Sequence, residues 1–125
     1  MRWFSQPPEQ RRFPRFRTDL RTTANLIRER DIISIHSRCE TISEGGIGAR
    51  GRGFQSLAVG DLVSLELDIP ICTHTLWVNS VVRYVVQRRN RARCGLQFLS
   101  LIDSQRTIIQ RYCHFLPVQK RSWWH

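Results

Sequence analysis

Apolar and polar residues alternate along most of this chain, which is the period of a β-strand with one buried face. The clearest run covers residues 63–69, where Val, Leu, Leu and Ile alternate with Ser, Glu and Asp before Pro70 ends the pattern. Similar alternation predicts strands over residues 20–27, 33–43, 76–86 and 94–98. The glycine-rich segment 45–53 should contain one more short strand flanked by turns.

The apolar period changes near the C-terminus. Asp103 or Ser104 can cap a helix, and the apolar residues that follow recur at helical spacing: Ile108, Ile109, Tyr112, Phe115 and Leu116. We expect this stripe to pack on the sheet. The chain is therefore predicted to be mainly β, a small six-stranded antiparallel β-barrel with a C-terminal α-helix.

The length of 125 residues suits one domain with a single core. Residues 1–10, which include Pro7-Pro8, are predicted to be a flexible tether. The folded domain should cover residues 11–116, with residues 117–125 as a tail that ends in Trp123-Trp124-His125. We find no signal peptide and no apolar segment long enough to span a bilayer, so a cytoplasmic protein is expected.

The formal net charge of +10 favours an anionic partner, such as a nucleotide, nucleic acid or acidic lipid. Nearly all basic residues are arginines, and Lys120 is the only lysine. Arginine favours planar, bidentate recognition, although arginine-rich coding of the genome would explain the bias equally well.

The four cysteines show no C-x-x-C pair and no nearby histidine at metal-ligand spacing. We expect buried, reduced thiols and no metal site. No nucleophile–base pair, nucleophile elbow, P-loop or dinucleotide fingerprint is visible, so the sequence predicts a protein that is not an enzyme and has no cofactor.

Two polar clusters could hold a ligand. Thr41 and Ser43 place hydroxyls on one face of a strand end, and Gly45-Gly46 follow as a turn where backbone can take positive φ. Upstream, Arg11 and Arg15 bracket a Phe-Pro pair. Guanidinium forks beside hydroxyls suit a planar ligand that carries phosphate.

Arg11-x-x-x-Arg15 followed by Thr41-x-Ser43-x-x-Gly46 resembles the paired signature of PilZ domains, small bacterial receptors for cyclic di-GMP. The family's second motif is Asp or Asn, any residue, Ser, two residues and Gly. This chain matches at Ser43 and Gly46 and departs at Thr41. The resemblance covers about residues 10–116 and implies the same six-stranded barrel with a C-terminal helix.

The resemblance implies that cyclic di-GMP is the ligand. Arg11 and Arg15 would bind phosphate and the O6/N7 edge of guanine, while the remaining motif residues would hold its other edge and the turn. The full set of predicted binding residues is Arg11, Arg12, Arg15, Thr41, Ser43, Gly45 and Gly46. A hydroxyl in place of a carboxylate at Thr41 should weaken binding by about 1–3 kcal/mol.

Three functions remain open from the sequence. The first is a single-domain receptor whose arginine arm orders on cyclic di-GMP and signals through a protein partner. The second is a related interaction module that does not bind the nucleotide. The third is a basic barrel that binds RNA or single-stranded DNA through Arg50, Arg52, Arg88, Arg89 and Arg91. Those arginines lack a flanking aromatic platform, which makes nucleic acid the least favoured partner.

Overall fold

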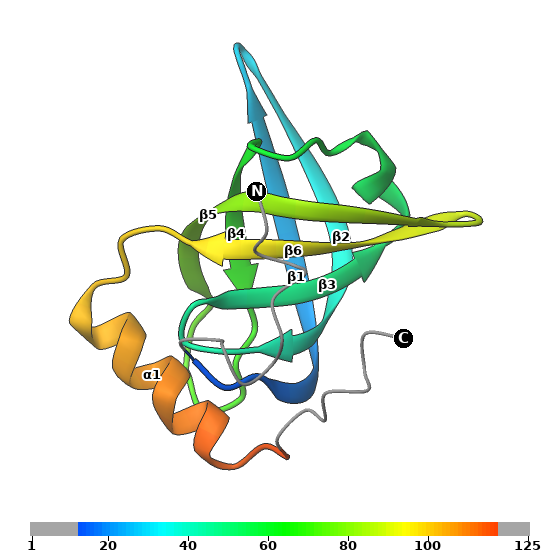
Figure 1. The fold of residues 1–125 in the computed structure, drawn as a ribbon. Coiled ribbons are helices and arrows are strands. Elements are labelled where there is room, and N and C mark those ends of the chain that lie inside the picture. Colours follow the sequence, from blue (N-terminus) through cyan, green and yellow to red (C-terminus); the bar gives the residue numbers. More distant parts are fainter. Residues whose placement is uncertain (1–12, 118–125) are drawn as a thin grey trace.

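Six antiparallel strands close into a barrel in the order β1-β2-β3-β6-β5-β4 (Figure 1). The structure is a computed structural model that describes residues 13–117. Its strands are β1 (Phe16–Arg28), β2 (Asp31–Ile42), β3 (Gly46–Gly51), β4 (Leu62–Leu67), β5 (Leu76–Arg88) and β6 (Arg91–Phe98). A 3-10 helix, η3 (Arg52–Ser56), follows β3, and α1 (Asp103–His114) ends the fold. The predicted barrel with one C-terminal helix is confirmed.

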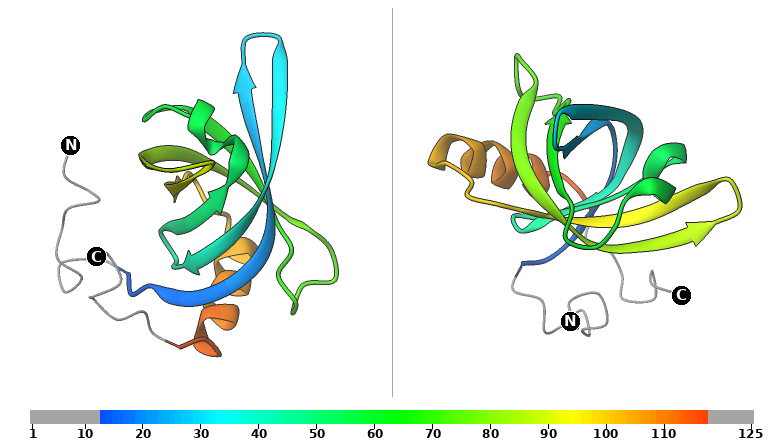
Figure 2. Two further views of the ribbon diagram at one scale, coloured as in Figure 1. Left: turned by 90° about the vertical axis from the view of Figure 1, so that its right-hand side faces the viewer. Right: turned by 90° about the horizontal axis from the view of Figure 1, so that it is seen from above.

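The inward positions of the strands form the core, and α1 closes one end of the barrel (Figures 1 and 2). Ile109 and Cys113 on α1 are buried among the strand side chains. Tyr112 adds a hydrogen bond to the hydroxyl of Thr18 on β1. The amide of Arg17 donates to the carbonyl of Pro117 at 2.9 Å. The helix is therefore fixed to the first strand, next to the predicted ligand-binding motifs.

Two hairpins extend beyond the barrel, β1–β2 and β5–β6 (Figures 1 and 2). Apolar alternation continues into the β1–β2 hairpin, where no core is available to bury it. Ile27 and Ile32 are register partners there and are 51% and 69% exposed. β1 also begins earlier than predicted, because Phe16 and Arg17 already pair with Ile42 and Thr41.

Three of the four thiols are buried, as expected, whereas Cys72 is half-buried. Burial raises the pKa of the Cys39 and Cys94 thiols far above the ordinary value. It also raises the pKa of Cys113 to about 12. These side chains act as small apolar core residues.

Within residues 13–117, no helix is both long and apolar enough to cross a membrane. The predicted tether of residues 1–10 lies outside the described residues, as does the predicted tail apart from Pro117.

Candidate ligand-binding site

The turn between β2 and β3 is closed by the side chain of Ser43. Its Oγ accepts hydrogen bonds from the amides of Gly45 at 3.0 Å and Gly46 at 3.2 Å. The amide of Ser43 donates to the carbonyl of Gly46 at 2.9 Å. Serine commonly closes turns in this way. The hydroxyl that the sequence assigns to the ligand therefore also organises the turn.

Gly46 is required by the close packing of β3 on β6. A Cβ at this position would lie 2.2 Å from the carbonyl oxygen of Leu96, so no side chain fits. The prediction of positive φ in this turn is wrong, because Gly60 is the only glycine in the described residues with positive φ. Close backbone approach, not φ, explains the glycine.

The segment before β1 lies against this turn. A Cβ at Gly45 would come within 3.1 Å of the Phe13 ring, which shows how closely the ring approaches. Arg15 follows two residues later and is only 9% exposed. Phe13 and Arg15 are therefore packed against the barrel. Arg11 and Arg12 lie outside the described residues.

A row of register partners crosses the outer face of the barrel beside the turn. Thr41 on β2 pairs with Gly48 on β3, which pairs with Gly95 on β6. Gly95 in turn pairs with Tyr84 on β5. The two central glycines carry no side chain, so they form a smooth floor between Thr41 and Tyr84. We call the surface of Gly48 and Gly95 the glycine floor.

Tyr84 lies across the glycine floor. A Cβ at Gly95 would come 2.1 Å from its ring, and one at Gly48 would lie 3.9 Å from its hydroxyl. Strict alternation along β5 would put Tyr84 on the same face as Val82. A register shift between Val82 and Tyr84 instead moves the ring to the outer face. Alternation alone cannot show such a bulge.

Arg15 reaches the same region. Burial lowers its pKa, and the charge and hydrogen bond of Tyr84 oppose that shift. A guanidinium held out of water interacts more strongly with an anion than one in solvent. Arg15, Tyr84 and Thr41 thus combine a cation, an aromatic ring and a hydroxyl around the glycine floor. These groups can bind an anionic aromatic ligand.

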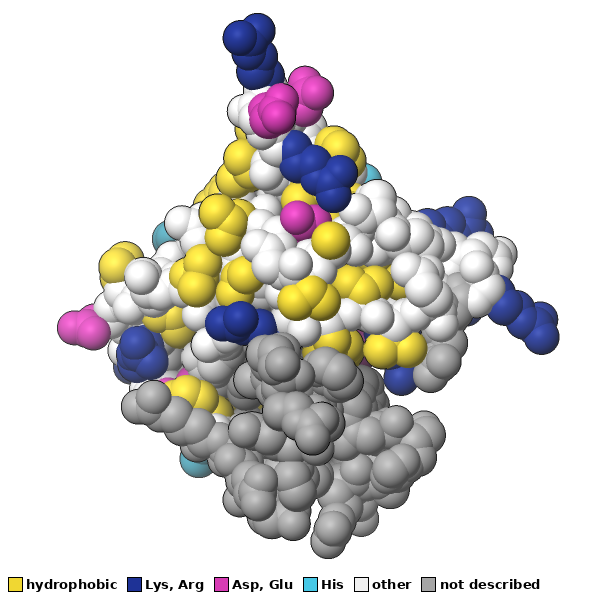
Figure 3. Space-filling view, turned by 45° about the horizontal axis from the view of Figure 1, so that its top comes forward, with side chains coloured by type: hydrophobic (Ala, Val, Ile, Leu, Met, Phe, Trp, Pro, Cys, Tyr) yellow, Lys and Arg dark blue, Asp and Glu magenta, His cyan; other side chains and the backbone are white. Residues whose placement is uncertain are grey.

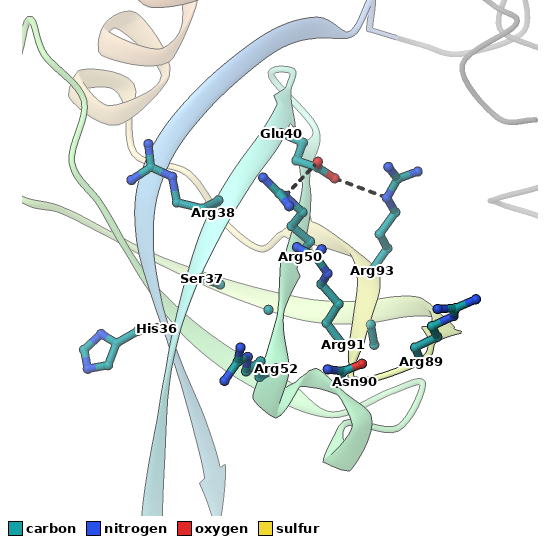
Figure 4. A pocket seen from close by; sticks show the side chains of 12 residues that line it. His36, Ser37, Arg38, Glu40, Arg50, Arg52, Arg89, Asn90, Arg91 and Arg93 are labelled. Atoms are coloured by element: carbon teal, nitrogen blue, oxygen red, sulfur yellow. Dashed lines mark ion pairs between the residues drawn. The ribbon is translucent and has the colours of Figure 1, made fainter.

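A second concave surface lies farther along the same strands (Figure 4). Its volume is about 990 Å³. We call it the arginine groove, because six arginines line it: Arg38, Arg50, Arg52, Arg89, Arg91 and Arg93. The alternative nucleic-acid site predicted from the sequence included Arg50, Arg52, Arg89 and Arg91, which this groove brings together. None of the predicted cyclic di-GMP residues that the structure describes lines it.

In the part of the chain that the structure describes, no group of three or more His, Cys, Asp and Glu side chains could hold a metal ion.

Comparison with protein-family models gives a match to the PilZ domain over residues 9–115. Comparison with curated proteins gives no match. Among solved structures, the PilZ domain with c-di-GMP of YcgR from Escherichia coli is similar, with 17% identity and a TM-score of 0.68. That match covers 86% of this chain and 91% of the YcgR domain.

Two larger proteins also share the fold. The Bacillus subtilis inhibitor of motility MotI/DgrA matches with 19% identity and a TM-score of 0.68 over 84% of this chain. MrkH of K. pneumonia, in complex with c-di-GMP, matches with 18% identity and a TM-score of 0.62 over 82%. The chain spans 50% of the length of each. At these identities the structural likeness establishes the fold alone.

Proposed function

The chain belongs to the PilZ domain family, and on that basis we propose that it is a receptor for cyclic di-GMP. The ligand would lie on the outer face of the barrel, beside the Ser43–Gly46 turn and against the Tyr84 ring that covers the glycine floor. This role requires recognition of two guanines and two phosphates and no covalent chemistry.

One observation carries the proposal. Arg15 and Thr41 belong to motifs separated by 25 residues of sequence, yet β1 and β2 bring them to one face, where Arg17 is the register partner of Thr41. Both side chains are buried at that face, with Tyr84 beside Arg15. An arginine fork can meet the O6 and N7 of guanine or a phosphate in bidentate fashion.

Ser43, Gly45 and Gly46 would act through the turn. Ser43 keeps the turn closed through its hydrogen bonds to the two glycine amides. The ligand would then approach a preformed surface, which lowers the entropy lost on binding. Arg11 and Arg12 are proposed to add guanidinium groups from the segment ahead of Phe13.

The test is calorimetric titration of the purified protein with cyclic di-GMP. Wild type should bind, and Arg15→Ala should weaken binding at least about 100-fold, because a charged hydrogen-bonding group is lost from a buried site. Arg89→Ala is the matched control, since it removes an equal charge from the arginine groove. Failure of folded wild type to bind would favour the alternative module that works without the nucleotide. Loss of binding only in Arg89→Ala would place the site elsewhere.

We further propose that signalling passes through a protein partner. An apolar patch formed by Ile27, Ile32 and Leu62 supports this proposal, because each of these side chains is more than half exposed. Ile27 and Ile32 are register partners. Leu62 on β4 directly precedes Val63, the register partner of Leu26 on β1, so it lies beside Ile27. Figure 3 shows hydrophobic side chains exposed beside the β1–β2 hairpin. Contiguous exposed apolar surface commonly marks a protein interface.

A photo-crosslinking residue at position 27 tests the partner proposal in cells with high and low cyclic di-GMP. The same residue at Arg111, on α1, is the control. We expect one adduct that forms at position 27, depends on cyclic di-GMP and is absent at position 111. No adduct, or the same adduct from both positions, would count against this surface.

A further inference from the structure

We propose that the arginine groove binds the phosphate backbone of double-stranded DNA. This inference goes beyond the proposed cyclic di-GMP receptor and does not depend on it, because the groove uses a different set of side chains.

Four of the arginines stand on the outer face of three adjacent strands. Arg38 on β2, Arg50 on β3 and Arg93 on β6 are consecutive register partners, so they stand side by side across the sheet. Arg91 lies two residues before Arg93 on β6, so both side chains point to the same side of the strand. Arg52 begins η3, directly after β3, and also lines the groove. Figure 4 shows these side chains around one concavity. Neighbouring strands are about 4.8 Å apart, which brings the charges close together.

Folding does not account for this arrangement. Like charges directly opposite each other on a sheet are destabilising, and Glu40 is the only acidic residue among the described residues of the lining. Its carboxylate pairs with Arg50 at 3.0 Å and with Arg93 at 3.3 Å. Within residues 13–117, no ion pair offsets Arg52, Arg89 or Arg91. Three concentrated cations therefore remain for an external anion.

The lining also selects the class of partner. Among the described residues, its lining contains no Phe, Tyr or Trp. Protein interfaces rely on aromatic and apolar anchors at their centre, and single-strand binders rely on aromatic stacking. A duplex backbone needs neither, because its phosphates supply most of the affinity through ionic contacts.

The shape of the β5–β6 hairpin favours duplex DNA. This hairpin extends beyond the barrel at one side of the groove (Figure 1), and Arg89, Asn90 and Arg91 lie at its end. Basic side chains project at the same side in Figure 3. The major groove of B-DNA is about 12 Å wide and admits a two-stranded ribbon, whereas that of an RNA duplex is too narrow. The hairpin would enter the major groove while the arginine groove receives the adjoining backbone.

Fluorescence anisotropy with a labelled 20-base-pair DNA duplex of mixed sequence tests this proposal. Arg89→Gln/Arg91→Gln should weaken binding about tenfold or more at 100 mM NaCl. The same double variant should also make the slope of log affinity against log salt concentration shallower by about two. Each phosphate contact contributes about 0.9 to that slope, and two contacts are removed. Arg30→Gln/Arg111→Gln is the matched control, since it removes the same charge outside the groove. That variant should bind within about threefold of wild type.

Glu40→Gln provides a test in the opposite direction. Removing the carboxylate releases Arg50 and Arg93 for phosphate, so binding should become about three- to tenfold tighter with a steeper salt dependence. Thermal melting of each variant confirms that it is folded.

Several outcomes would overturn the proposal. Wild type could fail to bind the duplex at 50 mM NaCl, the two double variants could lose equal affinity for DNA, or folded Glu40→Gln could bind DNA more weakly than wild type; each result would contradict the proposal. Tighter binding of single-stranded DNA or of an RNA duplex would replace duplex DNA as the ligand. Stronger competition by polyglutamate than by DNA of equal charge would point to an acidic protein. Calorimetry with cyclic di-GMP separates the two proposals, because Arg89→Gln/Arg91→Gln should retain dinucleotide binding.

Discussion

Thr41 stands where the family motif has a carboxylate or amide, and its side chain is 1% exposed. We predict that Thr41→Asp binds cyclic di-GMP more tightly, by about 1 kcal/mol or more, because the carboxylate supplies acceptors that a hydroxyl lacks. The added anion would repel the ligand phosphates. Arg15 and Arg17 offset that repulsion, and direct contacts act at shorter range than screened charges. Side-by-side titration of wild type and variant measures the difference.

Thr41→Asn is the control for this change, since an amide adds hydrogen-bonding capacity without charge. Burial of a carboxylate costs stability unless it is paired, so both variants need a folding check by thermal melting. Unchanged or weaker binding by folded Thr41→Asp would mean that residue 41 does not contact guanine. The module that does not bind the nucleotide would then be the better description.

Gly46 gives a stability prediction at the same scale. Gly46→Ala should lower the free energy of unfolding by about 1–3 kcal/mol, because the new methyl group meets the Leu96 carbonyl on a neighbouring strand. Gly45→Ala should cost less, since the atom that it meets belongs to the Phe13 ring, which can move. Urea denaturation of both variants measures the difference. Equal costs would show that strand packing is not the reason for Gly46.

At the scale of elements, alternation predicted five of the strands well because each buries one face in a single core, while β3 was expected only as a short strand within the glycine-rich segment 45–53. It failed where a strand contains a bulge. Tyr84 lies two residues after Val82, so strict alternation would point both side chains to the same face. The extra residue in the bulge, Arg83, turns Tyr84 to the opposite face. A bulge depends on the partner strand, so a single run of sequence does not reveal it.

The candidate site was predictable to the extent that it lies in short motifs. Thr41 and Arg15 were predicted from residue type and spacing, whereas the row formed by Gly48 and Gly95 was not. Their role arises only when β2, β3, β6 and β5 are placed in register. Ser43 was identified, but its turn-closing hydrogen bonds required the folded backbone. Long-range pairing explains each of these differences.

The strands also determine how the cysteines react. We predict that a disulfide-exchange reagent at pH 8 labels Cys72 first, while Cys39 and Cys94 react only after unfolding. The thiolate is the nucleophile, and burial raises the pKa of both core thiols, so they stay protonated at this pH. Mass spectrometry of the labelled peptides, with and without urea, identifies each site. Rapid labelling of Cys39 in the folded protein would contradict the closed barrel.

At the scale of the whole molecule, the two anion-binding surfaces share strands. Thr41, next to the glycine floor, directly follows Glu40, which pairs with two residues of the arginine groove. Both surfaces therefore lie on the outer face of β2, β3 and β6, while the apolar patch lies on β1, β2 and β4. One small barrel thus separates its charged surfaces from its exposed apolar surface.

This concentration of charge leads to a prediction for the intact protein. The chain has 20 Lys and Arg residues but only 10 Asp and Glu residues. Repulsion between like charges in the folded state should therefore exceed the attraction of the ion pairs. Surface ion pairs contribute about 0–1 kcal/mol each, and salt weakens them and the repulsion alike. Repulsion should dominate, and we expect the melting temperature to rise by about 3–6 °C between 20 and 300 mM NaCl. The melting temperature of Arg89→Gln/Arg91→Gln should rise less than that of Arg30→Gln/Arg111→Gln, because the first variant removes two positive charges from the surface where arginines are most concentrated. Calorimetric melting at each salt concentration decides this, and a falling melting temperature would show that the ion pairs outweigh the clustered arginines.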